Sequence, residues 1–399
     1  MWHNHDYLLW FNGDLASDLG NSIRTFAMPL IAYEVTSSLS TAGIIGAVGV
    51  IFTVATMLPG GVFADRYDRK SILVCGHVFG IAVWAIGAAL YFASALNEPA
   101  LFLLAAGAGI RSGFFGAASN AAIKQLVRDD QLSSAVAANQ AREATISVAS
   151  GPIAGILLTV SLVAPFLAQL LGHLSAWLST RMIRRSLDPR DGTQAPPWQS
   201  QLRATFLWLK SVPIIAIIIG VLSVTNVRLN GIFNTLVLSL RAADTAPTAI
   251  GFLSTAMGIG MIGGSLIAPF LVKRLPTGWI TIVAITWAAL WWGSAIVTTH
   301  LLVITIVFGL GAAGFPIANS ALGGYMFAQI PNAQMGAIMA VVGILAMSLL
   351  PFAPLVAGVG LDFVGRTPTL IAFTILILLS AALLLITPRI RQLPRPDRW

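Results

Sequence analysis

The sequence has few charged residues and only one cysteine. Asp, Glu, Lys and Arg make up 10% of its 399 residues, whereas a soluble domain usually carries about 25%. Hydrophobic residues reach 57%, and the mean hydropathy is +0.84. This composition excludes a water-soluble fold. Because Cys75 has no second cysteine to pair with, an intrachain disulfide and a cysteine-based metal cluster are also excluded.

Motifs for phosphate binding and catalysis are absent. The chain contains no Gly-x-x-x-x-Gly-Lys-Ser/Thr loop, so we do not expect it to hydrolyse ATP. It also has no Gly-x-Ser-x-Gly nucleophile turn and no His/Glu metal spacing. We therefore expect a protein that is not an enzyme, holds no cofactor or metal, and draws its energy from an ion gradient.

Long apolar runs dominate the chain. Crossing a bilayer takes roughly 20 apolar residues, and runs of that length predict an all-α membrane protein with twelve transmembrane helices. The predicted spans lie near residues 8–32, 40–63, 71–94, 100–122, 135–158, 162–182, 212–238, 248–272, 278–298, 301–327, 335–358 and 367–387.

The two halves of the chain resemble each other. The stretch from Gly109 to Ala118 is echoed by that from Gly311 to Ser320, and Gly151-Pro152 by Ala353-Pro354. Such an echo predicts two parallel six-helix repeats. We divide the chain into an N-terminal bundle (1–183), a cytoplasmic linker (184–211) and a C-terminal bundle with a short basic tail (212–399).

Positive charge is concentrated on one side of this predicted topology. Of the 23 Lys and Arg residues, seventeen fall in segments that are cytoplasmic when the N-terminus is inside, and only Arg241 and Arg366 fall in outer loops. The positive-inside rule then places both termini in the cytoplasm. We expect a multi-pass protein of the cytoplasmic (inner or plasma) membrane, surrounded by lipid. The cations do not form a basic-aromatic surface, so no nucleic-acid partner is expected.

A short charged turn separates the second and third predicted spans. It reads from Gly61 through Asp65, Arg66 and Arg69 to Lys70. This turn resembles the signature loop of the major facilitator superfamily, which implies a two-bundle transporter fold. By that resemblance the glycine allows close helix packing, the aspartate caps a helix end, and the basic residues lock a cytoplasmic gate. The alternative interpretation is that Asp65 and its neighbours form only a solvated charged loop.

A second motif lies in the fifth predicted span, where Gly151, Pro152 and Gly155 follow Ser150. It resembles the Gly-Pro motif of drug-proton antiporters in the same superfamily, where proline removes a backbone hydrogen bond and glycine permits close helix contact. The stretch 14–70 resembles the subfamily of macrolide-efflux proteins and the enterobactin exporter. That subfamily often has an acidic residue where Asn21 stands.

Ionisable residues inside the first span predict a polar site. Asp14, Asp18 and Asn21 follow i, i+4, i+7 spacing and share one helix face. Charges at a helix centre cost about 2.5 to 3.5 kcal/mol each when they face lipid, so these residues are expected to pair or face water. Two carboxylates one turn apart disfavour double ionisation, which suits proton coupling, with Asp18 preferred over Asp14. Structural pairing with arginines elsewhere is the alternative.

Charged residues in the fourth and fifth spans extend this interpretation. Arg111 resembles the buried basic residue of proton-driven members, and an ion pair between Arg111 and Glu143 is geometrically conceivable. Either residue then takes part in proton coupling or forms a static pair. Arg142 is interpreted as snorkelling toward the cytoplasm.

Asparagines give candidates for a substrate cavity. Asn226, Asn230 and Asn234 form a stripe at i, i+4, i+8 in the seventh span, and Asn319 lies in the tenth. Together with Asn21, they suit hydrogen bonding to substrate. The stripe equally suits hydrogen bonds between helices.

These observations predict a secondary transporter that works by alternating access. We favour a monomeric, proton-coupled exporter of a small amphipathic molecule such as a drug or siderophore, with substrate and protons as partners. The alternatives are a solute importer of the same fold and a membrane protein that binds a ligand without transporting it.

Overall fold

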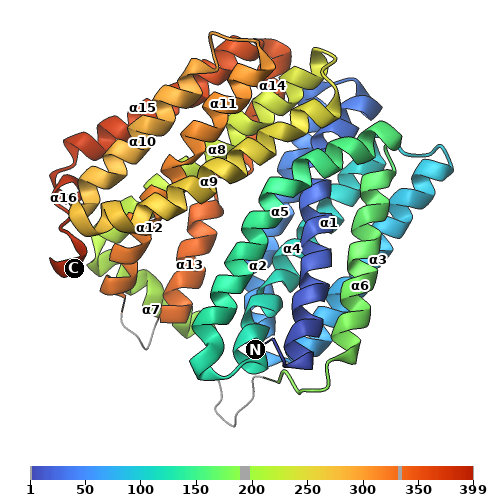
Figure 1. Ribbon diagram of the computed structural model, residues 1–399, viewed down its shortest axis with the longest axis horizontal. Helices are drawn as coiled ribbons and strands as arrows, with labels where there is room; N and C mark the ends of the chain where they lie inside the picture. Colours follow the sequence, from blue (N-terminus) through green and yellow to red (C-terminus); the bar gives the residue numbers. More distant parts are fainter. Residues whose placement is uncertain (1, 189–197, 331–334, 399) are drawn as a thin grey trace. The chain divides into compact units, whose positions relative to one another are not determined.

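The computed structural model describes residues 2–188, 198–330 and 335–398, and all regular secondary structure in these ranges is helical (Figure 1). The chain forms two compact units. The first comprises residues 1–196 together with 240–251, and the second comprises residues 197–239 and 252–399.

The first unit is built on six long helices, four of which begin at a residue whose side chain caps the helix. Asn4, Ser38, Asp68 and Asn97 each accept backbone N–H groups as the N-cap of the following helix. α1 packs against α5 and α6, α2 lies along α4, and α3 packs against α4 and α6. The helices are α1 (His5–Thr36), α2 (Leu39–Arg66), α3 (Arg69–Phe92), α4 (Glu98–Leu126), α5 (Leu132–Val160) and α6 (Ala164–Met182).

The second unit contains more and shorter helices. The predicted tenth span is divided at Ala313, and the eleventh is divided between Met347 and Phe352. The helices are α7 (Trp198–Ser211), α8 (Pro213–Ala242), α9 (Pro247–Arg274), α10 (Thr277–Ser294), α11 (Leu301–Ala312), α12 (Gly314–Gln329), α13 (Met335–Met347), α14 (Phe352–Phe363), α15 (Arg366–Ile386) and α16 (Pro388–Arg391). The end of α8 and the start of α9 belong to the first unit.

The helices confirm an all-α membrane protein. Nine helical segments of the described residues are long and apolar enough to cross a membrane. Two of these segments are the divided stretches Leu301–Gln329 and Ile338–Phe363. α1, α6 and α10 are helical but fall outside this set. α1 carries Asp6, Asp14, Asp18, Arg24 and Glu34. The number twelve stays a prediction.

The predicted linker contains a helix of its own. α7 occupies the last part of the segment 184–211, and residues 189–197 lie outside the described ranges. Thr205 and Leu209 of α7 are buried, whereas Phe206 and Leu207 are about half exposed. α7 packs against α13 of the same unit.

The basic tail is attached to the start of α10. The backbone N–H and the hydroxyl of Thr277 both donate to the Pro394 carbonyl, over 3.3 and 2.7 Å. Gly278 lies directly against the Ile390 carbonyl of α16. The first residue of α10 is therefore hydrogen-bonded to a residue that lies 117 positions later in the chain.

Close packing between α2 and α4 depends on a glycine next to the one expected. A Cβ on Gly60 would lie 2.6 Å from the Cα of Phe114, so α2 and α4 are in backbone contact there. A Cβ on Gly61 would meet nothing within 4 Å. The interpretation of Gly61 as the packing glycine is therefore wrong, because Gly60, and not Gly61, lies on the face of α2 that packs against α4.

This contact predicts opposite effects for two adjacent substitutions. Gly60→Ala should force α2 and α4 apart and lower the thermal unfolding midpoint, with a cost of about 1–3 kcal/mol. Gly61→Ala should leave the midpoint unchanged or raise it, because alanine favours a helix over glycine by up to about 1 kcal/mol. Thermal unfolding of the purified protein in detergent measures both. Equal midpoints for the two variants would contradict the assigned contact.

Candidate functional site

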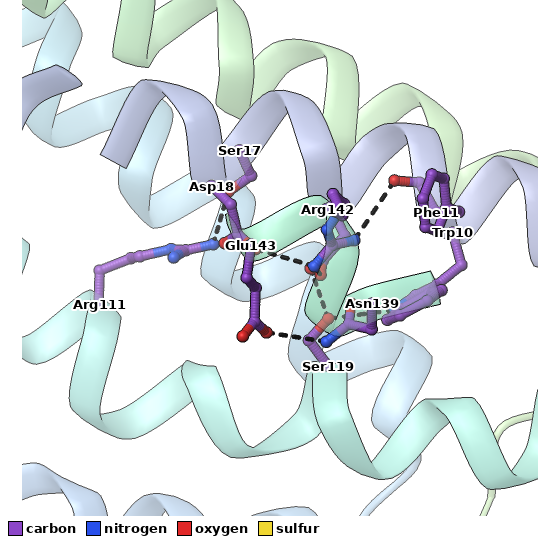
Figure 2. A network of polar contacts seen from close by, with 10 residues as sticks. Trp10, Phe11, Ser17, Asp18, Arg111, Ser119, Asn139, Arg142 and Glu143 are labelled. Atoms are coloured by element: carbon purple, nitrogen blue, oxygen red, sulfur yellow. Dashed lines mark hydrogen bonds and ion pairs between the residues drawn. The ribbon is translucent and has the colours of Figure 1, made fainter. Parts of the chain in front are cut away.

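Charged side chains of α1 and α5 meet inside the first unit (Figure 2). One guanidinium nitrogen of Arg142, Nη2, donates to Asp14 Oδ2 over 2.5 Å and to Asp18 Oδ2 over 2.9 Å. The two carboxylates share one face of α1, as their spacing predicts. The structure therefore joins one cation to two anions.

Arg142 lies deep in the unit. Its side chain is 3% exposed, and its guanidinium lies 5.5 Å from the ring of Trp10 and 5.3 Å from that of Phe11. A further nitrogen, Nη1, donates to the Phe11 carbonyl over 3.5 Å. The interpretation of Arg142 as a snorkelling residue is therefore wrong. Its guanidinium is directed at the carboxylates of α1 and not at the membrane surface.

The two aspartates have different surroundings. Asp14 accepts a second hydrogen bond, from Ser119 Oγ over 2.5 Å, and Ser119 in turn accepts from Trp10 Nε1 over 3.1 Å. The Asp14 side chain is 14% exposed, whereas that of Asp18 is 37% exposed. Asp14 is thus enclosed by donors on two sides. Asp18 has one hydrogen-bonding donor, Arg142, and a more exposed side chain.

Arg111 and Glu143 have separate partners. Arg111 Nη2 donates to Ser17 Oγ over 3.0 Å, and Glu143 accepts from Asn139 Nδ2 over 2.8 Å (Figure 2). Within the described part of the chain no ion pair joins Arg111 to Glu143. The pair considered from the sequence is therefore not formed.

A polar cavity of about 210 Å³ connects these groups. Both aspartates, both arginines and Glu143 line it, together with His77, Ser119 and three further residues. Charges of both signs around a small cavity can bind water or a proton. The cavity is small for a drug-sized ligand, for which pockets of about 300–1,000 Å³ are usual.

Two histidines next to this cavity were missed in the sequence. His77 of α3 and His173 of α6 are both buried, with their Nδ1 atoms 3.5 Å apart. His173 also contacts Ser17 Oγ at 3.4 Å and Gln169 Nε2 at 2.9 Å. The available signal was a histidine within each of two predicted membrane spans. A polar chain therefore runs from Arg111 through Ser17 to the histidine pair.

The charged turn between α2 and α3 contacts α4 and the segment that follows α6. Arg69 Nη1 donates to the Ala121 carbonyl over 3.2 Å, and Lys70 Nζ to the Ile183 carbonyl over 2.6 Å. Asp65 and Arg66 are exposed. Asp68, not Asp65, caps the helix: it accepts the N–H groups of Lys70 and Ser71 at the start of α3.

The Gly-Pro motif lies in a close helix crossing. α5 continues through Pro152, and a Cβ on Gly155 would lie 2.5 Å from the Pro247 carbonyl oxygen at the start of α9. A Cβ on Gly251 would lie equally close to the carbonyl oxygen of Gly151. An ion pair between Arg241 and Glu34 ties the same 240–251 segment to α1.

The candidate cavity asparagines bond mainly to backbone. Asn230 and Asn234 donate to the carbonyls of Asn226 and Asn230, one turn earlier on α8, and Asn226 donates to Ala346 of α13 over 3.2 Å. Only the Asn226 bond joins two helices, as the structural alternative for the stripe predicts, whereas Asn230 and Asn234 bond within α8. Asn21 accepts from Arg24 over 2.9 Å. Asn319 is partly buried in α12.

Comparison with known proteins assigns the family. The sequence profile described as Major Facilitator Superfamily matches residues 13–351. The chain belongs to this superfamily of transporters. No curated protein matches the sequence.

Solved structures share the fold at low identity. A nucleoside transporter, NupG, superposes with a TM-score of 0.74 at 13% identity, covering 96% of this chain and 98% of its own. A bacterial homologue of the iron transporter ferroportin gives 0.72 at 15%, covering 98% and 99%. A D-xylose-proton symporter gives 0.71 at 15%, covering 96% and 99%. Together with the family match, these structures indicate a secondary transporter and not an enzyme.

The ion cluster predicts a large stability cost for losing its cation. Arg142→Met should leave two carboxylates without their partner and cost about 3–5 kcal/mol. Asp14→Asn should destabilise more than Asp18→Asn, because Asp14 is more enclosed and has two donors. The thermal unfolding midpoint in detergent measures all three variants. Arg128→Met is the matched control, since Arg128 is 75% exposed in its pair with Asp130. If Arg142→Met unfolds like this control, the cluster does not stabilise the fold.

Proposed function

We propose that this protein is a proton-coupled secondary transporter that exports a small amphipathic molecule by alternating access. The observation that carries the proposal is the sharing of one buried guanidinium by Asp14 and Asp18 beside a polar cavity. The likeness to drug-proton antiporters in the Gly-Pro motif supports export. The superfamily match supports secondary transport.

A proton can change this cluster in a defined way. When both aspartates are ionised, Arg142 Nη2 is attracted to two anions on α1. Protonation of Asp18 removes one of these attractions, and the cation then pairs with Asp14 alone. The energy of a buried charge depends strongly on its partners. Protonation of Asp18 therefore changes the relative energies of alternative packing arrangements of α1 and α5. Asp18 is the better proton acceptor. Fewer donors stabilise its ionised form, and its greater exposure lets a proton reach it.

Twelve membrane crossings form part of the proposal. α6 and α10 have 19 and 18 residues, which corresponds to about 27–29 Å, close to the thickness of a hydrocarbon core. α1 is longer, with 32 residues, and packs along α5 and α6. Adding these three to the nine apolar segments gives the proposed twelve, and the positive-inside rule supports a cytoplasmic location for both termini in a cytoplasmic membrane.

Cysteine labelling tests this topology. In a Cys75→Ser background, single cysteines introduced as Arg66→Cys and Arg395→Cys should react with an impermeant maleimide only after the membrane is opened. Ala243→Cys, in an exposed turn of the predicted outer face, should react in intact cells. Labelling of Arg66→Cys and Arg395→Cys from opposite sides would contradict twelve crossings.

Proton-driven flux tests Asp18. In proteoliposomes with an imposed pH gradient, the wild-type protein should move a probe substrate and protons in opposite directions. We would use a macrolide and a cationic dye as probes, chosen by a susceptibility panel of cells with and without the protein. Asp18→Asn should abolish gradient-driven flux while folding and inserting normally.

The exposed surface variant Asp130→Asn supplies the control, and its flux should equal that of the wild type. Full gradient dependence in Asp18→Asn would eliminate Asp18 as the coupling residue. The D-xylose-proton symporter has the same fold, so movement of probe and protons in the same direction would indicate an importer. Absence of flux for every probe that binds would support a ligand-binding protein instead.

A further inference from the structure

The short helix α7 has one buried face and one exposed face. Thr205 and Leu209 are one turn apart and are 2% and 8% exposed. They mark the side on which α7 packs into the second unit, where α13 is its neighbour. The residues on the opposite side are all exposed, and they are Arg203, Phe206, Leu207 and Lys210. We call these four residues the outer face of α7.

The outer face combines positive charge with large apolar side chains. The spacing i, i+3, i+4 and i+7 places its four residues within an arc of about 100° around the helix. Phe206 and Leu207 are 49% and 58% exposed, and Arg203 and Lys210 lie one turn before and one turn after them. The cations and the apolar groups therefore form a single surface.

Nothing in the described part of the chain neutralises the two cations of this face. α7 contains no Asp or Glu, and neither Arg203 nor Lys210 forms an ion pair with a described residue. Water satisfies exposed cations, but it does not suit the two large apolar side chains between them. A partner that suits both carries negative charge above an apolar layer, as the surface of an anionic bilayer does.

The helix that follows α7 holds it close to the membrane surface. α8 begins at Pro213 and is apolar enough to cross a membrane. Residues 214–219 are all Ile or Ala, so its apolar part starts in the first turn. Lys210 precedes Pro213 by only three residues, which span at most about 10 Å. The end of α7 therefore lies near the lipid headgroups.

α7 itself is too short to enter the membrane as a span. It has 14 residues, which corresponds to about 21 Å, whereas the hydrocarbon core is about 30 Å thick. It is also absent from the candidate spans of the described residues. A short helix with cations and apolar groups on one face is typical of a helix that lies in the bilayer interface.

We propose that the outer face of α7 docks on the anionic headgroups of the membrane leaflet that α8 enters. Phe206 and Leu207 insert between lipids, and Arg203 and Lys210 bind the phosphates. The contact with α13 is kept, because docking uses the opposite side of α7. This proposal does not depend on proton coupling or on the direction of transport.

Spin labelling of the full-length protein in vesicles tests this docking. In a Cys75→Ser background, a nitroxide is attached to Leu207→Cys, and its accessibility to lipid-soluble oxygen and to a water-soluble nickel complex is measured. Adding phosphatidylglycerol to phosphatidylcholine vesicles should raise the accessibility to oxygen and lower that to nickel. Arg203→Gln/Lys210→Gln should lower the ratio of docked to undocked label about fivefold for each cation removed.

Matched variants separate docking from general charge effects. Lys273→Gln/Arg274→Gln removes the same charge from the exposed end of α9, and it should leave the label at Leu207→Cys docked. A label at Asp130→Cys, whose native side chain is 60% exposed, should stay accessible to nickel in both kinds of vesicle. Thermal unfolding in detergent verifies that every variant folds.

Three results would overturn the proposal. The first is equal accessibility of the Leu207→Cys label in vesicles with and without phosphatidylglycerol. The second is unchanged docking in Arg203→Gln/Lys210→Gln. The third is protection from nickel that persists in detergent without lipid, because protein would then cover the outer face.

Discussion

The burial of the Arg142 guanidinium against two carboxylates is the constraint on which the first unit depends. A guanidinium in a low-dielectric interior is costly unless its donors are satisfied and its charge is balanced. Asp14 and Asp18 supply that balance from a single face of α1. Because Arg142 is on α5, the pairing fixes both the rotation of α1 and its height relative to α5. The cavity, and the chain from Trp10 through Ser119 to Asp14, follow from this alignment.

The sequence predicted the local parts of this cluster but not the connection between them. Helical periodicity alone places Asp14 and Asp18 on one face. Which cation reaches that face depends on how α1, α4 and α5 pack, and periodicity says nothing about packing between helices. From the sequence, Arg142 was therefore interpreted as snorkelling toward the cytoplasm, and a pair between Arg111 and Glu143 was conceivable. The histidine pair was missed for the same reason, since His77 and His173 are 96 residues apart and meet only when α3 packs on α6.

Helix positions were predictable, because a membrane span is a long apolar run with polar ends. Two finer assignments were wrong by a few residues. The packing glycine was misplaced by one residue and the helix-capping aspartate by three. Gly60 and Gly61 are adjacent residues of the same type, but only Gly60 lies against α4. Asp68, and not Asp65, acts as the helix cap. In α8 the i, i+4 spacing that lines up the asparagines also lets Asn230 and Asn234 bond to the preceding turn.

The attachment of the tail to α10 has a consequence for biosynthesis. The start of α10 uses the Pro394 carbonyl as acceptor for both the amide and the hydroxyl of Thr277. A ribosome releases Thr277 into the membrane long before it has translated Pro394. During that interval the first turn of α10 must interact with water or lipid headgroups. The second unit therefore cannot complete this contact until Pro394 has been translated, and a chain terminated before Pro394 would leave this helix start without its native acceptor.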